Sequence, residues 1–320
     1  MPEWFHEAGI GETRLVRIVA GRIVEARILL EGATAAGSII AARLVSIGQG
    51  GRNAVARTED GVEILLPVRP AGVAEGARIA VELRREAIPG IEPWKRALGR
   101  LSESPVTAPV LPGQTLPFPP PPGDDRLEAA GWSDLLDEAR SGTVSFLGGA
   151  LRLSPTPAMT LIDVDGTLPI DALAVAGAAA AGAAILRLGI GGSIGIDLPT
   201  VRGKDARAAA ATTLDLALGD DQFERTAVNG FGFLQVVRPR RFASLLELAA
   251  DRPRFEARAL LRRAAMQGHG PCRLALPSAV AAVLEAQSHW LSALAVQRGG
   301  ATSLRVDRHL AMAAGHAEPA

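Results

Sequence analysis

Apolar and polar residues alternate along the first third of the chain, which predicts strands. Residues 14–31, RLVRIVAGRIVEARILLE, alternate on either side of an Ala-Gly pair, and we therefore predict a β-hairpin. Residues 38–67 and 77–86 continue the pattern, with Gly-rich turns between short apolar runs. Several short strands so closely spaced predict a small β-barrel of the oligonucleotide-binding type.

Aromatic residues are missing from the predicted barrel, because residues 37–86 contain no Phe, Tyr or Trp. Barrels of this type often bind single-stranded nucleic acid by stacking its bases on aromatic side chains. For the segment taken alone, a scaffolding role or weak contacts to a nucleic-acid backbone is therefore at least as consistent with the sequence as binding of single strands by base stacking.

The pattern changes at residues 105–123, which hold eight prolines. Because proline lacks an amide hydrogen and fixes φ, this stretch cannot be a helix or a central strand. We predict an exposed, partly polyproline linker. Apolar residues at helical spacing then predict an amphipathic helix over residues 125–141, and two strands follow it.

The middle of the chain combines two short apolar runs with an acidic residue at the end of each. The runs, residues 159–162 and 193–196, end at Asp163 and Asp197, and an Ala-rich helix is predicted between them over residues 171–188. Strand, helix and strand in this order predict a parallel βαβ unit. The two aspartates should then leave neighbouring strands at one edge of the sheet, where open α/β sheets bind ligands.

Asp165 adds a third carboxylate two residues after Asp163. Like charges within a few ångströms repel, so such a group is costly without a cation. Mg²⁺ takes one or two protein carboxylates together with phosphate and water. The sequence therefore predicts a magnesium site.

The remainder of the chain alternates helical and strand patterns. Helices are predicted over residues 203–218, 242–267 and 278–287, and strands over 226–237, 272–276, 291–297 and 302–306. From residue 244 onward these elements predict a small α+β domain.

Composition limits the classes of function. The chain has 320 residues and one cysteine, Cys272, which excludes an internal disulfide and a cysteine-based zinc site within one chain. No signal peptide and no membrane span are expected, so the predicted location is the cytoplasm. The net charge is zero, which argues mildly against a protein that grips many phosphates. Residues 238–263 nevertheless hold eight arginines against three acids, either as a solvated helix face or as a nucleic-acid contact.

One alternative is a haloacid-dehalogenase-like phosphatase. IDVDGTL fits the DxDGT signature of that family, with Asp163 as nucleophile and Asp165 as acid/base, and with Lys204 and Asp220 or Asp221 completing the site. In that family the signature normally opens the domain, whereas here it lies in the middle of the chain. The alternative also leaves Asp197 and GGSIGID without a role.

The order of motifs along nearly the whole chain resembles the ribonuclease E/G family. The opening hairpin is similar to the one that precedes the family's S1 barrel, and residues 38–100 take the place of that barrel. GGALRLSPTPAMTLIDVDG resembles the strands that lead into the catalytic IDVNSG-type motif, and ILRLGIGGSIGIDLPTV resembles LRLRxLGGxIVIDFIDM. NGFGFLQVVRPRR is similar to SxxGLxExTRxR, and CRLALPSAVAAVLE with GGATSLRVDRHL is similar to the small C-terminal domain.

The resemblance implies a metal-dependent endoribonuclease with a DNase I-like fold around Asp163. Asp163 and Asp197 would bind Mg²⁺, and Asp165 would take the place of a supporting catalytic asparagine. Metal-activated water is then the expected nucleophile. RNA is the implied partner, and the basic residues expected to contact it are Arg187, Lys204, Arg238, Arg240 and Arg241.

Several departures from the family pattern accompany the resemblance. The CPxCxG zinc link is absent after Arg241, so no zinc is expected, and any homo-oligomer would not be bridged by zinc. The 5′-end sensor is missing, and Thr200 replaces the acid of FIDM. These changes leave open a second alternative, a catalytically weak or inactive RNA-binding protein of the same family.

The predicted fold class is a multidomain protein of the α+β and α/β classes. Its parts are an N-terminal hairpin packed on the core (1–36), an S1/OB-like barrel (37–102), a Pro-rich linker (103–124), an RNase H-like remnant with a DNase I-like catalytic α/β domain (125–243), and a small C-terminal α+β domain (244–320).

Overall fold

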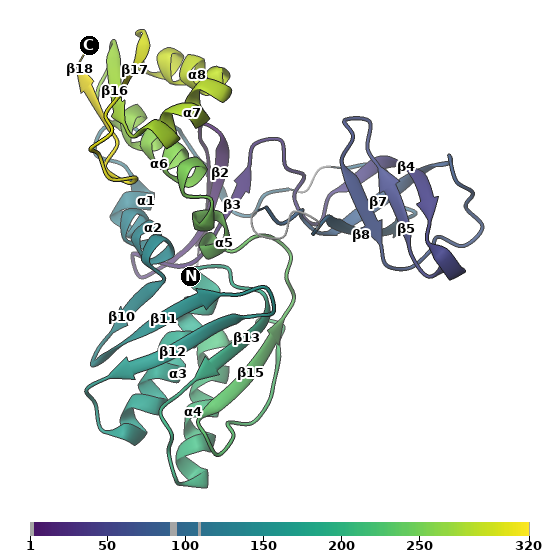
Figure 1. Ribbon diagram of the computed structural model, residues 1–320, viewed down its shortest axis with the longest axis vertical. Coiled ribbons are helices and arrows are strands. Elements are labelled where there is room, and N and C mark those ends of the chain that lie inside the picture. The colour runs from purple at the N-terminus through teal and green to yellow at the C-terminus, as the bar shows by residue number, and fades with distance from the viewer. Residues whose placement is uncertain (1–2, 90–94, 108–109, 320) are drawn as a thin grey trace. The chain divides into compact units, whose positions relative to one another are not determined.

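The protein is a mixed α+β chain with a closed five-stranded barrel (Figure 1). The computed structural model describes residues 3–89, 95–107 and 110–319. The chain forms two compact units, each made of separate stretches. Unit 1 consists of Met1–Glu31, Pro112–Arg140 and Leu248–Ala320, and unit 2 of Gly32–Leu111 and Ser141–Glu247.

Unit 1 contains a four-stranded sheet in the order β3-β2-β1-β9. Its strands are β1 (Glu3–Ala8), β2 (Glu12–Val19), β3 (Arg22–Leu30) and β9 (Gln114–Leu116). The predicted hairpin is confirmed as β2 and β3. They are joined by Ala20 and Gly21 with φ of 49° and 73°, the left-handed values that a tight hairpin turn requires.

The Pro-rich stretch is more than a linker. Its residues Gln114–Leu116 form β9, which pairs in parallel with β1 at the edge of the sheet. Phe118 packs against the core of unit 1. Proline is tolerated in or next to an edge strand, because an amide that faces away from the sheet has no hydrogen bond to lose to a neighbouring strand. Pro109, which was assigned to the linker, lies outside the described residues.

Two predicted helices are each broken into two. Residues 125–141 form α1 (Arg126–Ala129) and α2 (Trp132–Ser141), because Gly131 has a φ of +92° that no helix accepts. Residues 242–267 form α5 (Leu245–Ala250) and α6 (Arg252–Met266), and the Asp251 side chain caps α6 by accepting from the Arg254 amide.

The C-terminal elements surround a three-stranded sheet in the order β17-β16-β18. They are β16 (Cys272–Leu276), α7 (Ser278–Ala286), α8 (Ser288–Arg298), β17 (Thr302–Val306) and β18 (His316–Pro319). The predicted strand at residues 291–297 is wrong, because this stretch lies inside α8. A short apolar run fits either state, and here Trp290 and Leu294, four residues apart, are buried on one side of a helix.

The N- and C-terminal parts of unit 1 share one hydrophobic core. Ile10 belongs to the same buried cluster as Cys272, Leu274 and Trp290. Cys272 is fully buried, as its predicted strand position indicated. The first thirty residues and the last seventy therefore fold as one body.

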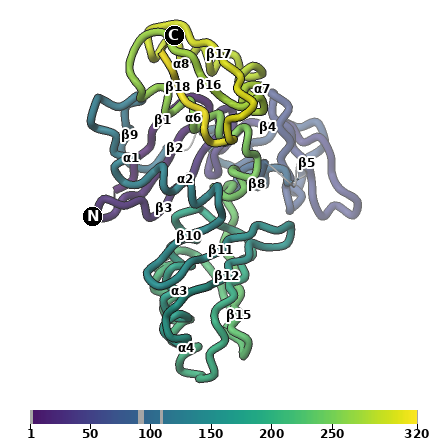
Figure 2. The backbone as a smooth tube through the Cα atoms, turned by 60° about the vertical axis from the view of Figure 1, so that its left-hand side comes forward, coloured from purple at the N-terminus to yellow at the C-terminus, as the bar shows by residue number. Residues whose placement is uncertain are grey.

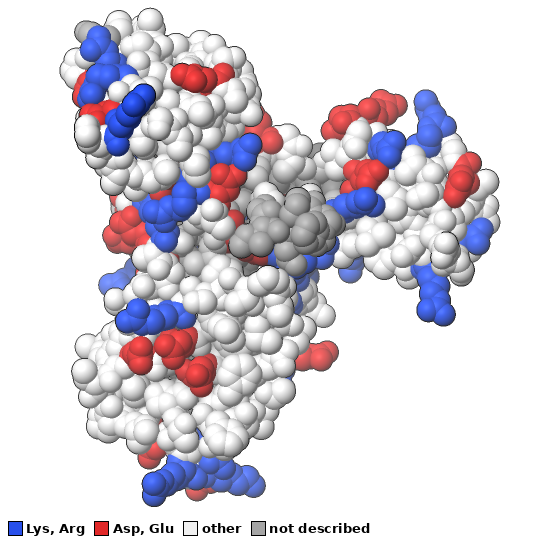
Figure 3. Space-filling view, viewed as in Figure 1, with Lys and Arg blue, Asp and Glu red and all other residues white. Residues whose placement is uncertain are grey.

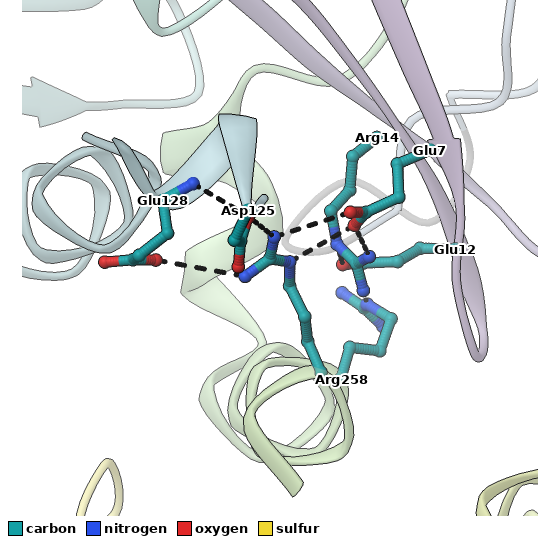
Figure 4. Close-up of polar contacts among 7 residues, drawn as sticks. Glu7, Glu12, Arg14, Asp125, Glu128 and Arg258 are labelled. Atoms are coloured by element: carbon teal, nitrogen blue, oxygen red, sulfur yellow. Dashed lines mark hydrogen bonds and ion pairs between the residues drawn. The ribbon is translucent and has the colours of Figure 1, made fainter. Parts of the chain in front are cut away.

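A network of charged side chains, buried except for Asp125 and Glu128, joins the three stretches of unit 1 (Figure 4). Its members come from β1, β2, the α1 region and α6, and they are Glu7, Glu12, Arg14, Asp125, Glu128, Arg258 and Arg262. Arg258 and Arg262 of α6 are each only 4% exposed. For these two arginines, the prediction of a solvated helix face or a nucleic-acid contact is therefore wrong.

The barrel has the strand order β4-β5-β6-β8-β7 and is closed. Its strands are β4 (Ile39–Ile47), β5 (Ala54–Arg57), β6 (Glu63–Leu66), β7 (Arg78–Arg85) and β8 (Ala97–Ser102). Leu44, Ile64 and Val81 fill its interior and are fully buried. The predicted small barrel is therefore confirmed.

The α/β domain of unit 2 is built on a six-stranded sheet in the order β10-β11-β12-β13-β15-β14. The elements are β10 (Thr143–Phe146), β11 (Gly149–Pro155), β12 (Thr160–Gly166), α3 (Ile170–Arg187), β13 (Gly192–Asp197), α4 (Lys204–Leu218), β14 (Glu224–Arg225) and β15 (Phe233–Arg238). β12 and β13 are parallel, as predicted, and the other pairs are antiparallel. The domain begins at Ser141 instead of residue 125.

Both helices lie on one side of this sheet, with α3 against β11 and β12 and α4 against α3 (Figure 1 and Figure 2). Ile162, Val164 and Ile196 point toward this side and are buried. Side chains alternate between the two faces of a strand, so the residues between them lie on the opposite, uncovered face.

Among the described residues, α3 is the single helix that is long and apolar enough to cross a membrane. α7 and α8 together reach that length and apolar character only as a pair bent by 89°. α3 contacts β11 and β12, and Leu173, Ala178 and Ile185 are buried. These are the contacts of a core helix in a folded domain.

Replacing Gly177 with valine is expected to destabilise the α/β domain. A Cβ atom at Gly177 would come within 2.4 Å of Cγ1 of Val164, so α3 would have to move away from β12. Overpacking of this kind costs about 1–3 kcal/mol. Urea denaturation measures the change, with Ala183→Ser on the exposed side of α3 as control. Equal stability of the two variants would show that α3 tolerates the added volume.

Candidate metal centre on the open face of the sheet

Asp163 and Asp197 are direct neighbours across β12 and β13. They are register partners in the parallel pair, and both are exposed. Asp197 ends β13 as predicted, but Asp163 lies in the middle of β12 and not at its exit. The reason is the antiparallel neighbour β11, which continues the ladder with β12 as far as Gly166.

Asp165 lies on the same face of β12 as Asp163. Asp163 and Asp165 are exposed, whereas Ile162 and Val164 between them are buried. Neighbouring strands lie about 5 Å apart, and alternate residues on one strand lie about 7 Å apart. The pair across the strands is therefore closer than the pair along β12, which favours Asp163 and Asp197 as the metal-binding pair.

Arg152 completes the charged face from β11. It is the register partner of Asp163, and its Nε lies 3.5 Å from Oδ2 of Asp165. Figure 3 shows acidic and basic side chains together over the sheet labelled β11 to β13 in Figure 1. The side chains of Arg152 and Asp165 are 70% and 67% exposed, so their ion pair contributes little to stability and is available to a ligand. Sequence reasoning missed Arg152, because only the strand register brings it to the aspartates.

Phe233 lies on the other side of Asp197. It is the register partner of Asp197 on β15, and its ring covers Gly195. A Cβ atom at Gly195 would lie 2.6 Å from Cζ of Phe233, so only a glycine at this position lets the ring pack this close to β13. The aspartate pair is thus bordered by an arginine on one strand and an aromatic ring on another.

The five basic residues predicted to contact RNA do not gather at the aspartates. Arg238 is buried on the helix-covered side of β15, where it forms an ion pair with Asp221 and donates to the Ile190 carbonyl over 2.9 Å. Its surroundings therefore give it a structural role. Asp221, a residue of the phosphatase alternative, is the acid in that pair.

The other four basic residues differ in their exposure. Arg240 forms an ion pair with Glu247 and is half-buried, and Arg187 ends α3 and is half-buried. Lys204 begins α4 and is exposed, and Arg241 is exposed. Among the five, Lys204 and Arg241 are thus the best placed to contact a ligand.

The donor set suits magnesium better than zinc. No group of three or more His, Cys, Asp or Glu side chains converges within the part of the chain that the structure describes. Structural zinc sites need four protein ligands, usually Cys and His. Mg²⁺ binds through one or two carboxylates and fills its other positions with water and phosphate oxygens. The adjacent carboxylates of Asp163 and Asp197 fit this second description.

Comparison with models of known protein families gives no match for this chain, and comparison with curated protein sequences gives none either.

Proposed function

We propose that this protein is a Mg²⁺-dependent endoribonuclease that hydrolyses phosphodiester bonds of single-stranded RNA in cytoplasmic RNA processing or decay. The observation that carries the proposal is the register of β12 and β13, which puts the exposed carboxylates of Asp163 and Asp197 side by side. A small closed barrel in the same chain and the motif order of the ribonuclease E/G family support RNA as the substrate. The proposal includes a DNase I-like relationship for the α/β domain.

The residues of the open face have separate roles in this proposal. Asp163 and Asp197 hold the metal, which relieves the repulsion between them. When bound, Mg²⁺ lowers the pKa of water and neutralises charge that develops on the phosphate. Arg152 leaves its weak pair with Asp165 and donates to a phosphate oxygen, as arginine does in many phosphate sites. Asp165 keeps the guanidinium near the site before the substrate binds.

The phosphatase alternative fits the fold less well. A nucleophile at the carboxyl end of a parallel sheet would meet phosphate beside helix N-termini. Asp163 lies within β12, which has an antiparallel neighbour, and its carboxylate is on the face opposite the helices. Asp221 is paired with Arg238.

An RNA-binding protein without catalysis is the second candidate. The observation that favours it is the lack of a third converging metal ligand among the described residues. Asp165, the residue that departs from the family pattern, also forms an ion pair with Arg152 in place of supporting the aspartate pair. This candidate predicts RNA binding that persists in EDTA and no cleavage with any divalent metal.

Metal removal tests the proposed activity. We expect EDTA to lower cleavage of a labelled single-stranded RNA by at least about a hundredfold, because the aspartate pair alone repels the phosphate. Added Mg²⁺ should restore cleavage. A small phosphomonoester serves as the control substrate and should not be hydrolysed. Cleavage that is unaffected by EDTA would contradict the proposal, and turnover of the phosphomonoester would support the phosphatase.

A further inference from the structure

A rigid turn precedes β15 and carries an exposed aromatic residue. The Asn229 side-chain oxygen accepts hydrogen bonds from the amides of Phe231 and Phe233, over 2.8 and 3.1 Å. The Asn229 amide donates to the Phe233 carbonyl over 2.9 Å. Three hydrogen bonds through one residue fix the backbone on both sides of Phe231.

The same turn is attached to the loop that leaves Asp197. The Thr200 hydroxyl donates to the Phe231 carbonyl over 2.9 Å, and the Leu198 amide donates to the Gly232 carbonyl over 3.2 Å. Gly232 has a φ of +94°, and a Cβ atom there would lie 2.2 Å from the Leu198 carbonyl oxygen. The turn therefore has a fixed place beside the end of β13.

Phe231 is 82% exposed on this turn. The chain has eight Phe and no Tyr, so exposed aromatic rings are scarce in it. A large apolar side chain held in water by a rigid backbone gains nothing for folding, and an aromatic ring presented in this way on a loop is available for stacking. The half-buried ring of Phe233, two residues further along, lies beside Asp197.

Cationic side chains lie on the loop to which the turn is attached and at the start of α4. Arg202 and Lys204 are both exposed. The Arg207 guanidinium donates to the carbonyls of Val201 and Arg202, over 3.1 Å each, and so holds this loop in place. Figure 3 shows Lys and Arg side chains together at the end of this domain near the label α4 of Figure 1. An aromatic ring beside cations is the combination with which proteins bind single-stranded nucleic acid.

We propose that Phe231 is a stacking platform for one nucleobase of single-stranded RNA, and that Arg202 and Lys204 contact the phosphates beside it. The inference rests on the proposed function, because it takes RNA as the ligand. Stacking accepts every base, so the platform would hold the strand without selecting its sequence. Phe231 lies two residues before Phe233, the register partner of Asp197. A strand stacked on Phe231 would therefore have a neighbouring phosphate near the aspartate pair.

The test measures binding of two probes to the full-length protein in EDTA, where no cleavage is expected. One probe is a fluorescent oligouridylate, and the other is an oligomer of the same length without bases. Phe231→Ala should weaken oligouridylate binding by about 5-fold to 150-fold, the range found for loss of one base–aromatic stack. Binding of the oligomer without bases should not change. Phe231→Trp should keep the wild-type affinity for oligouridylate.

The matched control is Leu216→Ala, at another apolar side chain that is 77% exposed on the same domain. It should leave both affinities unchanged. Unchanged oligouridylate binding by Phe231→Ala would overturn the inference, and so would an equal loss for both probes. Because the assay needs no metal, its result is independent of whether the protein cleaves RNA.

Discussion

Replacing Asp163 with asparagine is expected to lower the rate of RNA cleavage by about 100- to 1,000-fold, and Asp197→Asn should do the same. Each change removes one of two adjacent carboxylates but keeps the shape of the side chain. With one negative charge the site binds Mg²⁺ weakly, and neutralisation of the phosphate is lost. Both residues are exposed, so the fold should remain intact. Single-turnover cleavage of a labelled RNA, at the Mg²⁺ concentration that saturates the unchanged protein, measures the effect.

Asp165→Asn provides a contrast within the same strand. The resemblance to the ribonuclease E/G family expects an amide at this position, so this variant should keep or increase cleavage. A phosphatase that uses Asp165 as acid/base would lose activity instead. Asp171→Asn, in the exposed first turn of α3, is the control for a change of charge. If cleavage survives both Asp163→Asn and Asp197→Asn, the aspartate pair is not part of the active site.

Replacing Glu7 with glutamine is expected to destabilise unit 1 by about 3–5 kcal/mol, because it removes one of the carboxylates that neutralise two buried guanidinium groups. Glu7 is 1% exposed and forms ion pairs with Arg14 and Arg262. Burial lowers the pKa of Arg262, but the carboxylates of Glu7 and Asp125 outweigh burial and raise it, so this guanidinium stays charged. A loss of this size is a large part of the 5–15 kcal/mol that stabilises a typical folded domain.

Glu25→Gln is the matched control for Glu7→Gln. Glu25 forms an ion pair with Arg17 over 3.2 Å in the same sheet, but the two side chains are 22% and 28% exposed. Solvent screens this pair, and its loss should cost less than about 1 kcal/mol. Guanidinium chloride denaturation, followed by tryptophan fluorescence, compares the two variants, because Trp132 and Trp290 are buried in unit 1. Similar unfolding midpoints would show that the buried network contributes no more than a surface pair.

Local patterns predicted the strands, the barrel and the βαβ unit, because hairpin turns and apolar periodicity act over short stretches of chain. Beyond the hairpin and the parallel pair of β12 and β13, they did not predict which strands become neighbours. Arg152 comes to the site only through the antiparallel pairing of β11 with β12. The same pairing extends β12 past Asp163, which moves the aspartate from an expected edge to the open face.

Burial that depends on distant parts of the chain was the second feature that local patterns did not predict. Arg14 begins the stretch that predicts the hairpin, where nothing in the local pattern indicates burial, yet it is fully buried. Its burial depends on Glu7 from β1 and Glu12 beside it, and on α6 packing over them. No pattern within one segment contains that information. For the same reason the Pro-rich stretch was predicted as a linker although it supplies β9.

The charged network also sets an order of events during protein synthesis. Glu12 and Arg258 are separated by 246 residues in the chain. At ~5–20 residues per second a ribosome needs roughly 10–50 s to cover that distance. The barrel and the α/β domain are complete before α6 emerges, whereas the N-terminal strands must wait for their counter-charges. A nascent chain that stops before residue 258 therefore holds two finished domains and a sheet whose buried acids and Arg14 still face water.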